Sequence, residues 1–229
     1  MNFITICENV VKLMVKYWDK FLLTGLGYTL SLAAITVFFG AIFGSLIALL
    51  RMSKVAPFRW IAAAYTEIIR GTPMLLQLYL FYFGLPMLIP LLNKQQYACV
   101  AIALVCNSAA YVSEIIRSGI QAVDQGQTEA SRSLGLSQKQ TMLSVVLPQA
   151  VKNILPALGN EFIMITKDTS LASTFFIGDL MTQCLLIKGA TYLTIEPLLI
   201  IGIIYFVVTF VLSKVVSAYE RRLRRGDIR

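Results

Sequence analysis

The chain has 229 residues, of which 57% are hydrophobic and only 14% are charged, and its formal net charge is +8. Soluble domains carry about a quarter charged residues, so this balance argues against a soluble protein and indicates an integral membrane protein. Histidine is absent and the four cysteines form no CxxC pair. These absences exclude imidazole metal sites and His-dependent catalytic triads, and no metal site is expected.

Residues 1–20 are predicted to form an amphipathic segment. Lys12, Lys16 and Lys20 recur every fourth residue beside Tyr17 and Trp18. This pattern is typical of a helix that lies at the membrane interface. The same charges interrupt any apolar core of a cleavable signal peptide, so none is expected.

The first membrane span is predicted at Phe21–Leu50, a run of 30 residues without a charged side chain. A bilayer-crossing helix needs about 20 apolar residues, so the run is long enough to cross. Within it, Gly40 and Gly44 have the spacing of a close-packing face for another helix. Incidental glycines are an equally good explanation, because glycine is common in such spans.

Four further spans complete the predicted membrane domain, at about 74–92, 97–113, 141–165 and 197–213. Pro148, Lys152, Pro156 and Glu161 interrupt the span at 141–165. We therefore expect a broken helix that lies against protein or a water-filled cavity. Residues 169–187 are apolar but contain Gly178 and Asp179, and we expect them to form a partial or re-entrant segment.

A polar insert at Asp124–Ala150 interrupts the apolar chain. Asp124 with Gln127, and Ser137 with Gln140, have the spacing of a capping box, which predicts two helix starts. Gly135 stands where the first of these helices should end. The insert is therefore predicted to be a pair of short helices with a fixed break between them, a shape that another protein can bind.

The distribution of charge predicts the orientation of five spans. Of the 20 Lys and Arg, 14 fall on one side if residues 51–70, 117–152 and 214–229 share it. The positive-inside bias assigns that side to the cytoplasm, with the amino terminus outside and the carboxyl terminus inside. The polar insert would then be cytoplasmic.

The insert resembles the cytoplasmic "EAA" loop of permease subunits of bacterial ABC importers in the polar amino-acid uptake group. Glu129-Ala130-Ser131 stands for Glu-Ala-Ala, Gly135 follows after three residues, and Val145-Val146-Leu147-Pro148 follows after nine more. Ser131 and Val145 are conservative departures from that family's pattern. Other segments resemble the same family in order: 67–73, 107–117, 148–150, 155–157, 160–163 and 167–172. Together they cover about residues 24–219.

The resemblance implies an all-α membrane protein of the type I ABC-importer permease kind, with a coupling-helix loop at about 124–148. It implies a permease domain over residues 21–216 and a basic cytoplasmic tail over 217–229. It also implies these partners: a second permease subunit (an identical copy or a paralogue), two ATP-binding subunits, an external binding protein, membrane lipid and an amino acid. The chain has no phosphate-binding loop, so it is expected to be no enzyme, and ATP and Mg²⁺ would bind the separate ATPase.

Two sets of site residues follow. The resemblance assigns Glu129, Ala130, Ser131, Gly135 and Leu136 to the contact with the ATPase. Candidates for the substrate path are Gln77, Asn107, Glu161, Asp168, Thr169 and Ser170. A carboxylate such as Glu161 near the bilayer centre costs on the order of 3 kcal/mol, so it should face a cavity or a partner. An internal salt bridge to Lys152 or Lys167 explains Glu161 equally well, and backbone hydrogen bonds explain Gln77 and Asn107 equally well.

Ion pairs and lipid contact explain several charged residues outside the spans, without a role in the substrate path. Glu67 with Arg70, and Glu114 with Arg117, have the i,i+3 spacing of ion pairs on one helix face. The arginines of the tail favour contact with lipid headgroups. Nucleic acid is a poor partner, because no aromatic platform accompanies them.

Two other functions compete with the ABC permease. A secondary transporter would show an internal repeat and paired broken helices, and only one broken span is predicted. An intramembrane enzyme would need a nucleophile with a base, or a carboxylate pair, and Glu161 stands alone deep in the spans.

Overall fold

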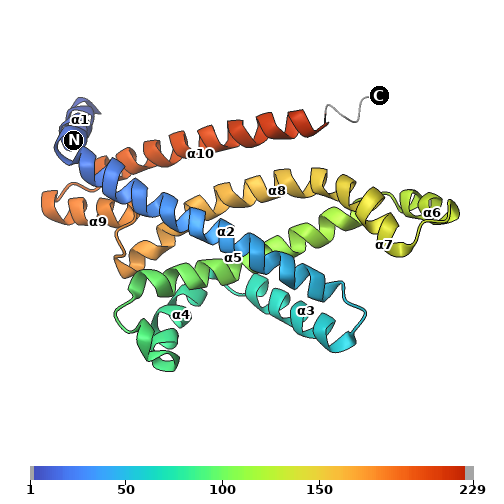
Figure 1. Ribbon diagram of the computed structural model, residues 1–229. Helices are drawn as coiled ribbons and strands as arrows, with labels where there is room; N and C mark the ends of the chain where they lie inside the picture. Colours follow the sequence, from blue (N-terminus) through green and yellow to red (C-terminus); the bar gives the residue numbers. More distant parts are fainter. Residues whose placement is uncertain (1–2, 225–229) are drawn as a thin grey trace. The chain divides into compact units, whose positions relative to one another are not determined.

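The structure is a computed structural model that describes residues 3–224, and every regular element in this part of the chain is helical. These residues form ten α-helices, whose course Figure 1 shows. They are α1 (Phe3–Trp18), α2 (Leu26–Arg51), α3 (Ala56–Gly71), α4 (Met74–Leu88), α5 (Gln96–Gln121), α6 (Gln125–Ser133), α7 (Gln138–Thr141), α8 (Leu147–Asp168), α9 (Leu180–Thr191) and α10 (Ile195–Arg224). Short π and 3₁₀ turns join some of them, at Asp19–Gly25, Pro90–Leu92, Met142–Val146 and Thr169–Phe175.

Four helical segments are long and apolar enough to cross a membrane: Phe3–Arg51, Gln96–Gln121, Gln138–Phe175 and Ile195–Leu223. The pair formed by α3 and α4 raises the number to five if it is counted as one span. The chain is therefore an all-α, multi-pass membrane protein, as its composition predicts.

The helix in the segment predicted as a span at 74–92 is shorter than expected. Helix α4 ends at Leu88, because Pro90 restricts the residue before it and Ile89 adopts an extended backbone. Thr72 before Pro73 is extended for the same reason, which separates α3 from α4.

The predicted break within the span at 141–165 is wrong. Helix α8 runs without interruption from Leu147 to Asp168 and includes Pro156. The irregular part lies before it, in the π turn Met142–Val146. The segment 169–187 is interrupted where expected, since Phe176 and Gly178 both adopt positive φ between the 3₁₀ turn and α9.

Within the described residues the chain divides into two compact units, each built from separate stretches of sequence. Unit 1 contains the chain up to Phe38, Pro73–Val105 and Ile163–Leu212. Unit 2 contains Phe39–Thr72, Cys106–Phe162 and the chain from Ser213 onward. The helices α2, α5, α8 and α10 each contribute to both units.

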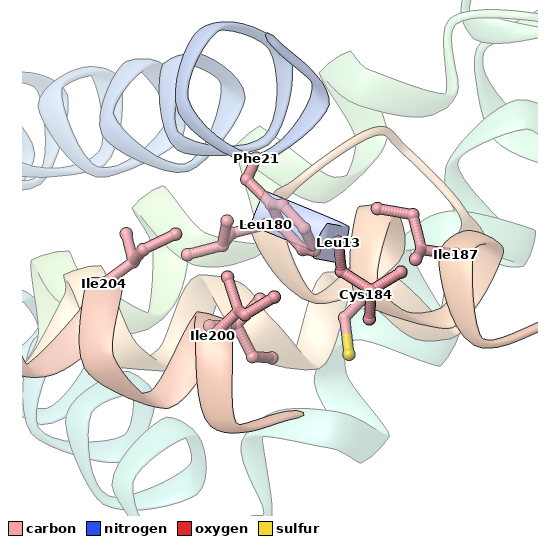
Figure 2. Packing of buried hydrophobic residues seen from close by; sticks show 8 residues of the cluster. Leu13, Phe21, Leu180, Cys184, Ile187, Ile200 and Ile204 are labelled. Carbon is pink, nitrogen blue, oxygen red and sulfur yellow. The ribbon is translucent and has the colours of Figure 1, made fainter. Parts of the chain in front are cut away.

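In unit 1, an apolar core ties the amino-terminal helix to α9 and α10 (Figure 2). Leu13 of α1 and Phe21 pack with Leu180 and Cys184 of α9 and with Ile200 of α10. Asn9 of α1 also donates a hydrogen bond from Nδ2 to Glu196 Oε1, at 3.1 Å. The amphipathic helix thus packs on the rest of unit 1 through its apolar face, a contact that its lysine spacing does not predict.

A second core in unit 1 is aromatic. Phe175 stacks on Tyr82 with ring centroids 4.2 Å apart and forms a T-shaped pair with Tyr79 with ring centroids 5.0 Å apart. Leu78 and Leu104 lie in the same cluster. Aromatic pairs of this geometry stabilise a fold beyond their buried area, so this core fixes the 3₁₀ turn Thr169–Phe175.

In unit 2, Gly40 and Gly44 of α2 allow close approach to α5. A Cβ on Gly40 would lie 2.6 Å from Ser108 Oγ, and one on Gly44 would lie 2.6 Å from Val112 Cβ. Both distances are shorter than any ordinary contact, so the two glycines form a packing face and are not incidental.

Candidate functional site: the bihelical insert

The insert predicted at 124–150 forms two short helices, α6 and α7, that lie beyond the ends of α5 and α8 (Figure 1). All of these residues belong to unit 2. Asp124 caps α6 by accepting a hydrogen bond at Oδ1 from the amide of Gly126, at 2.6 Å. The predicted capping box with Gln127 does not form, because the Asp124 carboxylate bonds the second amide of the helix and not the third. The Gln127 side chain instead accepts a hydrogen bond from Gln149 Nε2, at 3.4 Å.

The end of α6 has the geometry expected of a fixed break. Gly135 adopts φ +88°, its amide donates to Arg132 O at 3.0 Å, and the Leu136 amide donates to Ser131 O at 3.2 Å. These two bonds define a Schellman motif, which requires a left-handed residue at the position of Gly135. Arg132 adds a third link from Nη1 to Leu136 O, at 2.6 Å. The angle between α6 and α7 is therefore set by several hydrogen bonds.

The start of α7 confirms the second predicted capping box. The Ser137 amide donates to Gln140 Oε1 at 2.8 Å, and the Gln140 amide donates to Ser137 Oγ at 3.3 Å. Both ends of the break are thus hydrogen-bonded locally, so the insert is a shaped element and not an irregular loop.

The predicted contact residues differ in exposure. Glu129, Ala130 and Gly135 are exposed, Leu136 is partly exposed, and Ser131 is buried. The Ser131 hydroxyl donates to Gln127 O within α6, at 2.6 Å, so this side chain stabilises the helix internally. The structure adds Leu134, an apolar side chain that is 82% exposed beside Gly135. Sequence reasoning missed Leu134, although a leucine between a polar helix and a glycine break is a readable signal.

Unit 2 also contains a charge cluster that sequence spacing predicts only in part. Arg117 pairs with Glu114 on α5, as expected from the i,i+3 spacing. Arg51 at the end of α2 lies 2.6 Å from Glu114 Oε2, and Arg70 of α3 lies 3.7 Å from the same atom. Among the ion pairs of residues 3–224, Arg70 therefore pairs with Glu114 and not with Glu67, so the predicted Glu67–Arg70 pair is wrong. A single carboxylate links three helices.

The substrate-path candidates fall in both units. Gln77, Asp168, Thr169 and Ser170 belong to unit 1, whereas Asn107 and Glu161 belong to unit 2. Glu161 is buried, with 8% of its surface exposed, and Gln77 is buried as well. The Thr169 hydroxyl donates a hydrogen bond to Thr166 O at 2.8 Å, so this donor is already bonded within its own segment.

Comparison with known proteins identifies the family. The family "Binding-protein-dependent transport system inner membrane component" matches residues 37–225. The arginine transport system permease protein ArtQ of Bacillus subtilis (strain 168) is 44% identical over 207 residues, which cover 90% of this chain and 94% of ArtQ. The L-cystine transport system permease protein TcyB of the same organism is 40% identical, over 88% of this chain and 86% of TcyB.

Solved structures of ABC transporters are also similar to this chain. A chain from a crystal structure of an amino acid ABC transporter with histidines has a TM-score of 0.88 and 45% identity, over 97% of this chain and 99% of that chain. An inward-facing MetNI methionine ABC transporter has a TM-score of 0.66 at 19% identity, over 90% and 95%, and shares the fold. The chain belongs to the family of binding-protein-dependent transport system inner membrane components, the membrane-spanning permeases of ABC importers.

Proposed function

We propose that this chain is the permease subunit of an ATP-driven importer of polar amino acids, and that α6 and α7 couple it to a separate ATPase. The observation that carries the coupling is the Schellman motif at Gly135, which holds an exposed Leu134 and the exposed face of α6 at a fixed angle. A rigid element can transmit a displacement, whereas a flexible loop absorbs it. Membership in the permease family supports the same role.

The contact with the ATPase would combine one apolar and one charged anchor. Leu134 offers apolar surface that gains free energy when it is removed from water. Glu129 lies five residues before Leu134, is exposed on α6 and offers a carboxylate. The partner's groove should therefore contain an apolar pocket with a donor nearby. Ser131 is assigned to the internal stability of α6 and not to the contact.

The partners follow from this role. Two ATPase subunits, which bind ATP and Mg²⁺, would receive the bihelical inserts of two permease chains, either identical or paralogous. The insert and the carboxyl terminus would then be cytoplasmic, and a binding protein would deliver the amino acid on the opposite face. The bias of Lys and Arg supports this orientation.

A polar amino acid is the substrate class that the relatives support. The similar proteins are named for arginine, cystine and glutamine transport. Glu161 is a buried carboxylate on α8 and is our candidate for the group that meets the substrate ammonium or a cationic side chain. Gln77, Asn107, Asp168, Thr169 and Ser170 remain candidates for the substrate path, each within its own unit.

Reconstitution tests the coupling. The chain in lipid nanodiscs, with its permease partner, is titrated with the purified ATPase subunit, and hydrolysis is measured with and without loaded binding protein. We expect no hydrolysis by the permease alone and binding-protein-stimulated hydrolysis after the ATPase is added. Uptake that persists in ATP-depleted vesicles under an ion gradient would instead identify a secondary transporter.

A paired comparison tests Glu161. Glu161→Gln removes the charge but preserves size, so uptake of a cationic amino acid should fall more than uptake of a neutral one. Glu8→Gln, an exposed carboxylate on α1, is the control. Equal effects of Glu161→Gln on both substrates would remove Glu161 from the substrate path.

A further inference from the structure

A cavity of about 370 Å³ lies in unit 2, between the end of α5 and the inner side of α6 and α7. Its apolar wall is formed by Ile120, Val123, Met142 and Val146. An apolar cavity of about 150 Å³ already admits a benzene ring, so this one has room for a large side chain. Neither the family motif nor the substrate path accounts for this cavity.

The rim of the cavity, in contrast to its wall, is polar. Thr128 and Arg132 of α6 and Gln138 of α7 line it and are exposed, so the rim lies at the surface. Arg132 is the single charged residue among those that line it, and no carboxylate does. The cavity is therefore suited to an apolar group accompanied by a hydrogen-bond acceptor, and it disfavours a cation.

Thr141 provides the second observation. It lines the same cavity, only 2% of its surface is exposed, and its hydroxyl has no hydrogen-bond partner in the described part of the chain. A buried hydroxyl without a partner destabilises the fold, because it has lost its hydrogen bonds to water and gained none in return. Its helix continues directly into the π turn Met142–Val146, and such turns are frequent at functional sites. An acceptor from outside the chain would satisfy this hydroxyl.

We infer that this cavity is a receptor for one side chain of the ATPase subunit, an aromatic or aliphatic group with an acceptor beside it. This occupant follows from continuity of surface, because α6 and α7 supply the cavity rim and are also the two helices of the proposed coupling surface. The contact is then reciprocal. Leu134 inserts into the ATPase, and a side chain of the ATPase inserts beneath α6. This inference rests on the proposed function.

Two variants test the cavity from inside and from its rim. Thr141→Val keeps the shape but removes the hydroxyl, so affinity for the ATPase, measured with the permease in nanodiscs, should fall about five-fold. The melting temperature of the permease alone should stay equal or rise, because an unsatisfied group has been removed. Thr128→Phe should fill the cavity from its rim and weaken binding about ten-fold or more. Thr66→Val is the control: its hydroxyl is bonded to Ala62 O at 2.8 Å, so stability should fall while affinity stays unchanged.

A diazirine analogue of methionine at position 142 tests the occupant directly. Illumination of the assembled complex should crosslink it to one side chain of the ATPase, identified by mass spectrometry. Crosslinks confined to the permease, or unchanged affinity in both Thr141→Val and Thr128→Phe, would overturn the inference. If Leu134→Asp abolishes ATPase binding while those two variants bind normally, the proposed function stands and the reciprocal contact fails. If the wild-type chain binds no ATPase, both fail.

Discussion

Arg51 and Glu114 are separated by 63 residues in the chain, and their side chains meet with Nη1 and Oε2 2.6 Å apart. Arg70 and Arg117 bind the same carboxylate, and Arg70 also lies over the ring of Tyr111 at 5.5 Å. Glu114 therefore holds the ends of α2 and α3 against α5. Four charged groups share a site that is only partly open to water, so each depends on the others.

Glu114→Gln should destabilise unit 2. The substitution leaves three guanidinium groups without their shared carboxylate, and removal of one partner of a buried pair costs about 3–5 kcal/mol. The site is partly exposed, so we expect about 1–3 kcal/mol after solvent screening. Thermal unfolding in detergent measures the effect. Glu8→Gln, which breaks the exposed Glu8–Lys12 pair, is the control and should change stability by less than about 0.5 kcal/mol.

Gly40→Ala and Gly44→Ala should destabilise the packing of α2 on α5. The added methyl group would overlap Ser108 or Val112, and overpacking of this kind costs about 1–3 kcal/mol. Gly27→Ala in the same helix meets no atom within 4 Å, so it should be neutral or stabilise the helix by up to about 1 kcal/mol. Equal melting temperatures for all three variants would contradict the close approach of α2 to α5.

Substitutions at Gly135 should follow backbone strain and not side-chain size. A Cβ there would meet no atom within 4 Å, so the cost arises from φ +88° alone, about 1–2 kcal/mol for most residues. Gly135→Asn should retain more substrate-stimulated ATP hydrolysis than Gly135→Ala, because asparagine tolerates the left-handed region. Gly135→Val should retain least. Hydrolysis rates of the reconstituted complex give the order, and equal rates for Asn and Val would contradict it.

Leu13→Ala should release α1 from unit 1. Leu13 is the buried residue of α1 and packs in the core with Phe21 and Ile200. Loss of a buried leucine costs about 2–5 kcal/mol. Hydrogen exchange should show faster exchange in α1 than in the wild type. Val11→Ala, at an exposed position of the same helix, should leave exchange unchanged.

The sequence by itself determined the class of protein, the main spans, the capping box at Ser137 and the break at Gly135. These features depend on local composition and on residues within four positions of each other, so spacing is enough to predict them. The same reasoning failed at two points. Asp124 had two amides within reach and caps α6 through that of Gly126, not that of Gln127. Pro156 was expected to interrupt a helix, but α8 continues through it.

Only the tertiary structure decided the remaining relationships, because they join residues far apart in the chain. Glu114 pairs with Arg51 and Arg70, Asn9 bonds Glu196, and the cavity at Thr141 is lined by the end of α5 together with α6 and α7. Glu114 and Asn9 each have several possible partners of the right chemistry in the sequence. The packing of the helices decides which of these groups meet and which helix ends line the cavity, and no periodicity in the chain records it.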